Sequence, residues 1–243
     1  MTPTPAQREL IARACRVLAV RGLADGILGH ISLRIDENTL LVRCRGAQER
    51  GLAFTTAADV HWVDLDGAPA AVGELADGYT VPNELPLHTE LLRRRPEINA
   101  VLHAHPPTVV AADLAGLGVR PILGSFDIPG AHLAAGGVPV YPRAVLVRSR
   151  TLATEVCEAM GDRPVVVMRG HGLTSVADTV ERAVLQAVSV DTISRFSLQV
   201  ASAGGTLVDI AEEDWADLPD LGGSFNVATS WRHELARLHD CGC

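Results

Sequence analysis

The chain has 243 residues, of which 47% are hydrophobic, and its 21 basic and 29 acidic side chains give a formal net charge of −8. This length suits one large domain or at most two small ones, and a chain of this size buries enough surface to fold without disulfides. The acidic balance argues against a nucleic acid partner, the lack of an apolar run of roughly 18 residues argues against a membrane span, and the lack of a secretory signal points to the cytoplasm.

The first elements that the sequence predicts are a helix and a β-hairpin. Thr4 as the N-cap and Pro5 at the first helical position begin a helix that stops at Gly22. Alternating polar and apolar residues predict strands over 30–35 and 39–43, with a turn between them.

The middle of the chain adds strands, a loop and a second helix. A strand over 60–63 leads into a turn, and the small, glycine-containing residues 67–82 predict a loop. Residues 84–95 predict a helix that ends before Pro96. The dense apolar run 99–105 predicts another strand, which two prolines close.

The rest of the chain predicts two strands, a long helix, a linker and a short terminal helix. In this order they span residues 138–141, 165–168, 178–205, 212–223 and 230–238. Asp178 and Glu181 have the spacing of a capping box at the start of the long helix. Because strands and helices alternate along one continuous chain, the sequence predicts an α/β sandwich.

Lysine and cysteine usage narrows the chemistry further. All basic residues are arginine, which excludes mechanisms that need a lysine amine, such as Schiff bases with carbonyl substrates. An enzyme that acts beside a carbonyl would then need a metal ion as its electron sink. The five cysteines include no C-x-x-C pair, which argues against a disulfide framework or a cysteine-rich zinc site, and Cys241 and Cys243 are expected to form an inert tail.

Three histidines form a candidate metal site. His103 and His105 stand two apart on a predicted strand, so both imidazoles leave the same face and can converge on one ion. Packed or surface histidines show the same spacing, so the pair alone leaves both interpretations open. His171 strengthens the metal interpretation, because Gly170 and Gly172 on either side of it let the backbone approach another element closely. Three neutral imidazoles suit zinc or a neighbouring divalent transition metal and leave coordination positions open for a substrate.

A carboxylate would complete such a site, as a fourth ligand or as an acid and base. Glu84 is the best placed, because it stands at the start of the helix that precedes His103. Two alternatives stay open. Glu84 can be an ordinary acidic residue that complements the helix dipole, or it can form a different metal pair with His88, one turn further along the same helix face.

Five short motifs are spread along the chain, at residues 29–32 (GHIS), 83–88 (NELPLH), 95–105 (RPEINAVLHAH), 134–137 (AAGG) and 170–173 (GHGL). Together they resemble the class II aldolase/adducin family over about residues 5–205. The resemblance implies a three-layer α/β/α sandwich with a largely antiparallel central sheet, and a divalent metal ion surrounded by a Glu, the H-x-H pair and the later His. It also implies a homo-oligomer, typically a tetramer with its sites at subunit contacts. Residues 1–205 would form this catalytic domain, and residues 206–243 an extension that packs on the same domain or on a neighbouring subunit.

The chain departs from the sugar-phosphate aldolases of this family at the positions that bind phosphate. His30, Arg45 with Gly46, and Pro82 with Asn83 replace the Asn, the Thr-Gly pair and the two serines of the aldolase pattern. The resemblance therefore implies that the phosphate cradle is dismantled. The tyrosine that protonates the leaving group in those aldolases also has no evident equivalent.

Arg45 suggests a carboxylate substrate instead, because its planar guanidinium matches a carboxylate in two hydrogen bonds. Arg43 and Arg50 are alternatives for this role. Any of the three can instead be an ordinary surface residue whose charge is solvated by water. The loop of residues 43–56 is most similar to the decarboxylase branch of the family, which acts on hydroxylated aromatic dicarboxylates such as a dihydroxyphthalate.

The leading hypothesis is a metal-dependent decarboxylase of a hydroxylated aromatic dicarboxylate, with a divalent transition metal (Zn, Mn, Fe or Co) as Lewis acid. Glu84 would contact the metal and carry the proton to the ring carbon, a role that burial would favour by raising its pKa. His30, Arg45 and Asn83 would orient the second carboxylate and the hydroxyl of the substrate. The metal ligands would be Glu84, His103, His105 and His171, and the substrate-binding residues His30, Arg45 and Asn83.

Two other functions are compatible with the same scaffold. One is a retro-aldolase, dehydratase or epimerase that acts on an unphosphorylated hydroxy-keto substrate with the same metal, and release of an aldehyde rather than carbon dioxide would identify an aldolase. The other is a non-catalytic assembly module like the adducin head, which keeps the fold while the metal ligands are lost. A stoichiometric metal measurement separates that module from an enzyme.

Overall fold

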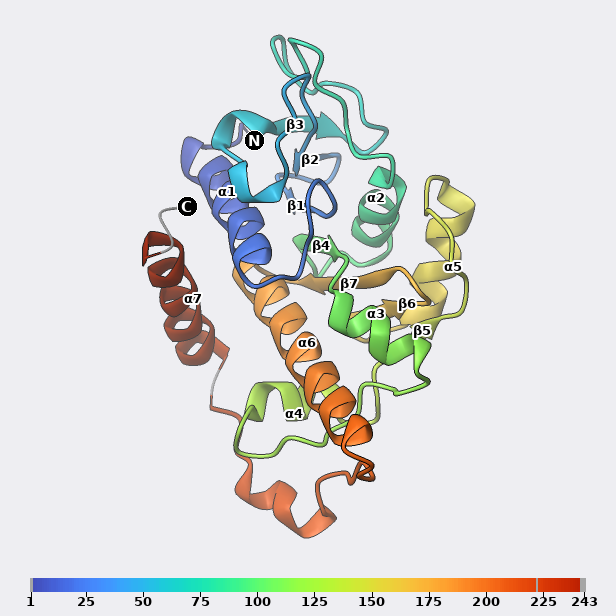
Figure 1. Cartoon of the computed structure of the whole chain (residues 1–243). Coiled ribbons are helices and arrows are strands. Elements are labelled where there is room, and N and C mark those ends of the chain that lie inside the picture. Colours follow the sequence, from blue (N-terminus) through green and yellow to red (C-terminus); the bar gives the residue numbers. More distant parts are fainter. Residues whose placement is uncertain (1, 222, 241–243) are drawn as a thin grey trace.

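The computed structural model describes residues 2–221 and 223–240, so Cys241 and Cys243 lie outside the described residues. At its centre is a seven-stranded sheet with the order β3-β2-β1-β4-β7-β6-β5 (Figure 1). Neighbouring strands are antiparallel except β5 and β6, which run parallel. The strands are β1 (His30–Arg34), β2 (Thr39–Arg43), β3 (Val60–Asp64), β4 (Ala100–Ala104), β5 (Val140–Tyr141), β6 (Val165–Met168) and β7 (Gly172–Ala177).

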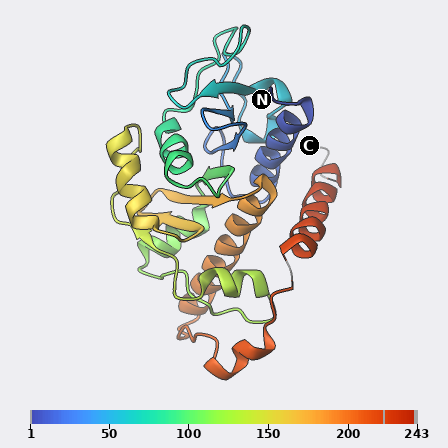
Figure 2. The same ribbon diagram turned by 180° about the vertical axis from the view of Figure 1, so that it is seen from behind.

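Helices cover both faces of this sheet. Figures 1 and 2 show α2 and α5 on one side of it and α1, α6 and α7 on the other, and each side has its own hydrophobic cluster. The fold is therefore the three-layer α/β/α sandwich with a largely antiparallel sheet that the resemblance implied. None of the helices in the described residues is long and apolar enough to cross a membrane. The helices are α1 (Pro5–Val20), α2 (Leu85–Arg94), α3 (Pro107–Leu114), α4 (Ile128–Ala134), α5 (Arg150–Met160), α6 (Val180–Ser202) and α7 (Gly223–Asp240).

Adjacent residues of the central strands face opposite layers, as the pleat of a strand requires. On β4, Val101 joins the cluster beneath α2 and α5, whereas Leu102 joins the cluster beneath α1 and α6. On β6, Val166 and Val167 divide in the same way. Because these strands are buried on both faces, their residues are apolar except for His103 of β4, which is why the sequence revealed them.

The structure confirms most of the elements predicted from the sequence. Thr4 caps α1 through a capping box with Gln7, and Pro5 occupies the first turn. The hairpin of β1 and β2, the strands β3, β4, β5 and β6, and the helix α2 all occur at the predicted places. Residues 67–82 connect β3 to α2 without a helix or strand of their own.

One strand and three short helices were not predicted: β7, α3, α4 and α5. β7 pairs with β4 on one side and with β6 on the other. Its hydroxyl side chains, Thr174 and Ser175, interrupt the apolar run by which the other buried strands are identified. Tertiary pairing on both sides, rather than local pattern, therefore forms this strand.

The C-terminal third differs from the prediction in its boundaries. Thr179, not Asp178, is the N-cap of α6, because the Thr179 side chain accepts a hydrogen bond from the backbone N–H of Arg182. Asp178 instead pairs with the Arg182 guanidinium at 3.2 Å, so the predicted capping box is wrong. The predicted linker contains a 3-10 helix at Glu212–Asp217, and α7 begins well before the predicted residue 230.

The last helix packs against α1 and α6 of the same chain (Figure 2). Trp231 and Leu238 are buried in the hydrophobic cluster on that face of the sheet. Nε of Arg21 donates to Oε2 of Glu234 at 2.7 Å, and the Glu234 side chain is 3% exposed. Apolar burial and an ion pair therefore hold the C-terminal segment on the domain.

Candidate metal centre

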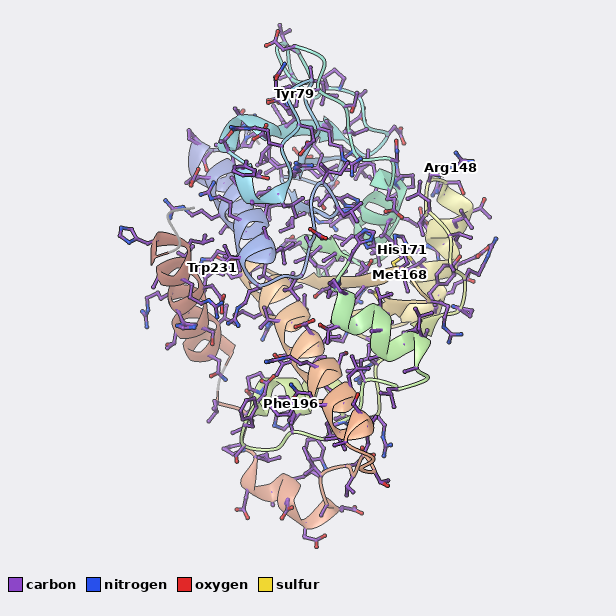
Figure 3. All side chains as sticks on the ribbon, in the orientation of Figure 1. Tyr79, Arg148, Met168, His171, Phe196 and Trp231 are labelled. Carbon is purple, nitrogen blue, oxygen red and sulfur yellow. The ribbon has the colours of Figure 1, made fainter. Side chains whose placement is uncertain are left out.

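Three separate elements bring Glu84, His103, His105 and His171 together. Glu84 is the N-cap residue of α2, His103 lies on β4 and His105 follows the end of that strand. His171 lies in the turn between β6 and β7 (Figure 3). One ligand atom from each residue lies within 4.8 Å of all the others. The structure thus gathers all four residues that the sequence predicted as metal ligands.

The pairing of β4 with β7 brings His171 to the other two histidines. Gly172 pairs with Met168 across the β6–β7 turn, and a Cβ atom added to Gly172 would lie 2.2 Å from the carbonyl oxygen of Ala104. Only glycine therefore permits this approach of the two backbones. The ring centroid of His171 consequently lies 4.9 Å from that of His103 and 4.7 Å from that of His105.

A hydrogen bond to β7 fixes the tautomer of His103. Its Nδ1 lies 3.0 Å from the carbonyl oxygen of Leu173, and because a carbonyl only accepts, Nδ1 carries the hydrogen. Nε2 then faces Oε2 of Glu84 at 3.3 Å, and this buried nitrogen has no hydrogen-bond partner among the described residues. The approach of this nitrogen to a carboxylate is favourable only with positive charge between the two atoms, either a proton on Nε2 or a bound cation. The residues therefore fit a divalent metal.

Buried electrostatics give the cluster the protonation states that metal ligands need. Burial raises the pKa of Glu84, but the contact with His103 and the backbone N–H of Val147, which donates to Oε1 at 2.8 Å, outweigh it and lower that pKa to about 2. Burial, followed by the charges of His103 and His171, lowers the pKa of His105 to about 3. Burial likewise lowers the pKa of His171. The expected net rise in the pKa of Glu84 is thus wrong, because the partners of the carboxylate outweigh the effect of burial.

His30 and Arg45, two of the predicted substrate-binding residues, lie beside this cluster. His30 pairs with His103 across β1 and β4, and its Nε2 is 3.9 Å from Oε2 of Glu84. Arg45 donates from Nη2 to the carbonyl oxygen of Ile27 at 3.2 Å. Burial is the main reason why the pKa values of His30 and His105 are low, and the charge of Arg45 lowers them further. The positive charge of Arg45 thus acts on His30 and on one histidine of the cluster.

Asn83, the third predicted substrate-binding residue, is exposed and lines a surface cavity of about 350 Å³ together with Arg93 and Arg150. A larger cavity of about 870 Å³ lies between α4, α6 and α7. Neither is lined by any of the four residues of the metal centre. The structure therefore gives Asn83 no contact with the cluster, and its role in substrate binding stays a prediction.

Of the two alternative interpretations of Glu84, the structure contradicts the metal pair with His88. Nε2 of His88 lies 2.7 Å from Nδ1 of His30, and Nδ1 of His88 lies 2.7 Å from Oγ of Ser32. Both ring nitrogens of His88 are thus engaged, which excludes it as a partner of Glu84 in a separate metal site. Glu84 does lie at the N-terminus of α2, where a carboxylate complements the helix dipole, but its side chain makes no capping hydrogen bond and accepts one from Val147 instead.

The alternative arginines have other partners. Arg43 is 3% exposed and forms an ion pair with Glu49. The guanidinium of Arg50 lies over the ring of Phe54, 5.4 Å from its centroid. Of the three, Arg45 is the one whose charge acts on His30 and His105, and its role toward a substrate carboxylate stays a prediction.

The sequence analysis did not identify two buried polar residues that contact histidines in or beside the cluster. Ser32 and Thr174 are buried polar residues on β1 and β7, and Thr174 Oγ1 lies 3.2 Å from Nδ1 of His103. One signal was present for Ser32: it stands two residues after His30 on a strand, so both side chains face the same layer. No local signal marked Thr174, because β7 itself was not predicted.

Comparisons with known proteins agree with this architecture. The model of the class II aldolase and adducin N-terminal domain matches residues 9–198. A 3,4-dihydroxyphthalate decarboxylase of Arthrobacter keyseri is 75% identical over 231 residues, which cover 95% of this chain and 93% of that protein. A protein of the same name from a Terrabacter species is 67% identical over 96% of this chain and 97% of its own length. A solved aldolase II superfamily protein from Pseudomonas syringae has a TM-score of 0.80 at 23% identity, covers 100% of this chain and 96% of its own, and shows the shared fold alone.

Proposed function

The chain belongs to the class II aldolase and adducin family, and on that premise we propose that it is a metal-dependent carbon–carbon lyase that decarboxylates a hydroxylated aromatic dicarboxylate. The substrate class is that of the dihydroxyphthalates, which the names of its highly similar relatives indicate. The observation that supports the metal dependence is the convergence of one ligand atom from each of the four clustered residues within 4.8 Å of the others. An assembly module that has lost its metal ligands would not retain this complete set.

The four clustered residues would hold the metal as one carboxylate and three neutral imidazoles. This donor set suits Zn, Mn, Fe and Co alike, so the identity of the ion stays a prediction. When bound, a divalent ion supplies a Lewis acid that stabilises negative charge on oxygens of the substrate. The ligands are Glu84, His103, His105 and His171.

Glu84 is the residue that moves the proton. Its pKa is lowered to about 2, so the carboxylate is ionised at neutral pH. A base this weak accepts the hydroxyl proton of the bound substrate only where that hydroxyl is made acidic, which is the chemistry that a bound Lewis acid would supply. Glu84 then donates this proton to the ring carbon that bears the departing carboxylate. The carbon–carbon bond breaks, its electron pair returns to the ring, carbon dioxide leaves, and the product oxygen regains a proton from water. The hydroxide left from that water combines with carbon dioxide as hydrogencarbonate, so atoms and charges balance with water as the one co-reactant.

Arg45 and His30 orient the substrate. The guanidinium of Arg45 has the geometry to bind the second carboxylate through two hydrogen bonds. His30 presents Nε2 toward the cluster, 3.9 Å from Oε2 of Glu84, where it can contact a substrate oxygen. The side chains of His103 and Glu84 are 0% and 5% exposed, so the reacting end of the site is dry and its charges act strongly.

The assembly and location of the enzyme belong to this proposal as well. We propose a homotetramer, as the resemblance to the family implies, and a cytoplasmic location stays a prediction from the sequence. Light scattering of the purified protein measures the subunit count directly. A monomeric mass with full activity would contradict the proposed assembly.

The test is carbon dioxide release from a small panel of dihydroxyphthalates. We expect turnover with Zn or Mn added, no turnover after chelation, and recovery when the metal is returned. Full activity in chelator, or no carbon dioxide from any member of the panel, would overturn the proposal. The same assay distinguishes aldol cleavage, because an aldehyde would then appear instead of carbon dioxide.

A further inference from the structure

Three buried polar side chains, linked in a row by hydrogen bonds, end at the metal centre. Oγ of Ser32 lies 2.7 Å from Nδ1 of His88, and Nε2 of His88 lies 2.7 Å from Nδ1 of His30. Ser32 and His88 are 0% exposed and His30 is 3% exposed, so water does not reach these contacts. The far nitrogen of His30 faces Glu84 at 3.9 Å. The direction of the hydrogen bonds along this row therefore decides whether Nε2 of His30 presents a hydrogen or a lone pair to a substrate.

Only two directions are possible when both rings are neutral. In the first, the Ser32 hydroxyl donates to Nδ1 of His88, and Nε2–H of His88 donates to Nδ1 of His30, which leaves the hydrogen of His30 on Nε2. In the second, every donor is reversed and His30 presents a lone pair at Nε2. His30 is a hydrogen-bond donor toward the site in the first case and an acceptor in the second.

The hydroxyl of Ser32 favours the first direction. When His88 donates to Ser32, the hydroxyl hydrogen of Ser32 needs another acceptor. Within the part of the chain that the structure describes, Ser32 Oγ has its hydrogen bond to His88 and no other. A buried donor without an acceptor is costly, whereas an unused lone pair on a hydroxyl oxygen costs less. In the first direction the one hydrogen left over is that on Nε2 of His30, which faces the site, whereas the second direction leaves the buried hydroxyl hydrogen of Ser32 without an acceptor.

Glu84 favours the same direction independently. Its Oε2 lies 3.9 Å from Nε2 of His30 and 3.3 Å from Nε2 of His103. A carboxylate oxygen attracts an N–H group and repels a lone pair. A hydrogen on Nε2 of His30 therefore makes its approach to Glu84 favourable, whereas a lone pair there would make it unfavourable.

We infer that Ser32 and His88 are positioning residues that hold His30 in the tautomer with hydrogen on Nε2, so that His30 is a neutral hydrogen-bond donor to an anionic oxygen of the substrate. This inference rests on the proposed function and adds the role of a stationary donor for His30, which separates it from Glu84, the residue that moves the proton. A fixed N–H in a dry site stabilises negative charge on oxygen without having to reorient during the reaction.

Two substitutions of His30 test the donor role. His30→Gln places an amide N–H near the position of Nε2, and we expect it to retain kcat within about tenfold of the natural enzyme. His30→Glu places an acceptor there, and we expect kcat to fall about 100-fold to 1000-fold, as when an oxyanion donor is removed. The opposite order, with His30→Glu the more active, would show that His30 acts as a base and would overturn the inference.

Ser32 tests the positioning role. Ser32→Ala removes the terminal donor, and we expect a lower kcat with unchanged metal content, whereas Ser32→Thr restores a hydroxyl and recovers kcat. Ser197→Ala is the matched control, because Ser197 is also a buried serine but its hydroxyl donates to the carbonyl oxygen of Ile193 on α6. An equal loss of kcat in Ser32→Ala and Ser197→Ala would mean that Ser32 is merely structural.

Neutron diffraction of the metal-loaded enzyme reads the tautomer directly and needs no turnover. We expect deuterium on Nε2 of His30, on Nε2 of His88 and on the Ser32 hydroxyl. Deuterium on Nδ1 of His30 would overturn the inference even if carbon dioxide is released. If no dihydroxyphthalate releases carbon dioxide, the proposed function fails, and the deuterium positions still decide the tautomer.

Discussion

The carbonyl oxygen of Leu173 accepts a hydrogen bond from Nδ1 of His103 at 3.0 Å. This contact joins β7 to β4 and turns the other nitrogen of His103 toward Glu84. A ligand histidine held in this way by a backbone carbonyl has a fixed ring orientation and tautomer before any metal binds. The metal centre is therefore preorganised by the sheet itself.

Substitutions of His103 and Glu84 should separate metal binding from turnover. His103→Ala removes a buried ligand, so we expect loss of both bound metal and carbon dioxide release. Glu84→Gln keeps an oxygen ligand but cannot accept and return a proton, so we expect retained metal and a kcat lower by about 100-fold or more. Metal analysis and the carbon dioxide assay on the same preparations check both. The control is His132→Ala, because the ring of His132 forms a hydrogen bond with the carbonyl oxygen of Leu218, and it should leave both measurements unchanged. A Glu84→Gln enzyme with normal turnover would contradict the proton role.

Gly172 should be required for the position of His171. In Gly172→Ala the added methyl group would lie 2.2 Å from the carbonyl oxygen of Ala104, so β7 must move away from β4. We expect a loss in the free energy of unfolding of about 2 kcal/mol or more together with weaker metal binding. Gly118→Ala is the control, because nothing lies within 4 Å of an added Cβ there. Chemical denaturation and metal titration of the two variants measure the difference, and equal behaviour would contradict the steric argument.

Residue spacing made much of the site predictable from the sequence. His103 and His105 share a strand face by simple alternation, and the flanking glycines drew attention to His171. Their convergence could not be derived locally, because it depends on β7, whose Thr174 and Ser175 lack the apolar pattern of the other strands. The lowered pKa of Glu84 could not be predicted from the sequence either, because burial alone would raise it. Only the structure shows the N–H of Val147 and the ring of His103 beside the carboxylate.

The same distinction between local and non-local signals explains the fold. α1 was predicted with its cap because Thr4 and Pro5 signal the start of a helix within one turn, and the structure adds the reciprocal hydrogen bonds of Thr4 with Gln7. At α6, two adjacent residues compete for the capping position, and the extended backbone of Thr179 gives the role to its hydroxyl rather than to Asp178. A sequence pattern that fits either residue cannot decide between them.

The metal-free protein should lose stability in mild acid. The pKa of His105 is lowered to about 3, chiefly by burial, whereas the ordinary histidine value is about 6.5. Below about pH 6.5 the unfolded chain binds a proton that the folded chain does not, so stability falls as the pH falls toward about 3. Denaturation of the metal-free protein across this window checks the direction. His105→Gln should show a shallower dependence, and an identical slope in both proteins would contradict the assignment.

The ion pair between Arg21 and Glu234 should stabilise the C-terminal helix on the domain. Glu234→Ala leaves a half-buried guanidinium without its acceptor, so we expect a loss of about 1–3 kcal/mol in the free energy of unfolding. Asp209→Ala breaks the ion pair with Arg120, in which both side chains are 44% exposed, and should cost at most about 1 kcal/mol. Thermal or chemical denaturation compares the two variants, and a larger loss for Asp209→Ala would refute the role of the buried pair.

Arg45 should discriminate between dicarboxylate and monocarboxylate substrates. A guanidinium that binds the second carboxylate contributes nothing to a substrate that lacks this group, so Arg45→Ala should raise KM for a dihydroxyphthalate about tenfold or more and change KM for a dihydroxybenzoate little. Arg50→Ala is the matched control, because that guanidinium rests on the ring of Phe54. Steady-state kinetics with both substrates measure the effect. Equal changes in KM for the two substrates would show that Arg45 acts through the general charge of the site rather than as a carboxylate clamp, since a nearby positive charge attracts any anionic substrate whereas a clamp requires the second carboxylate.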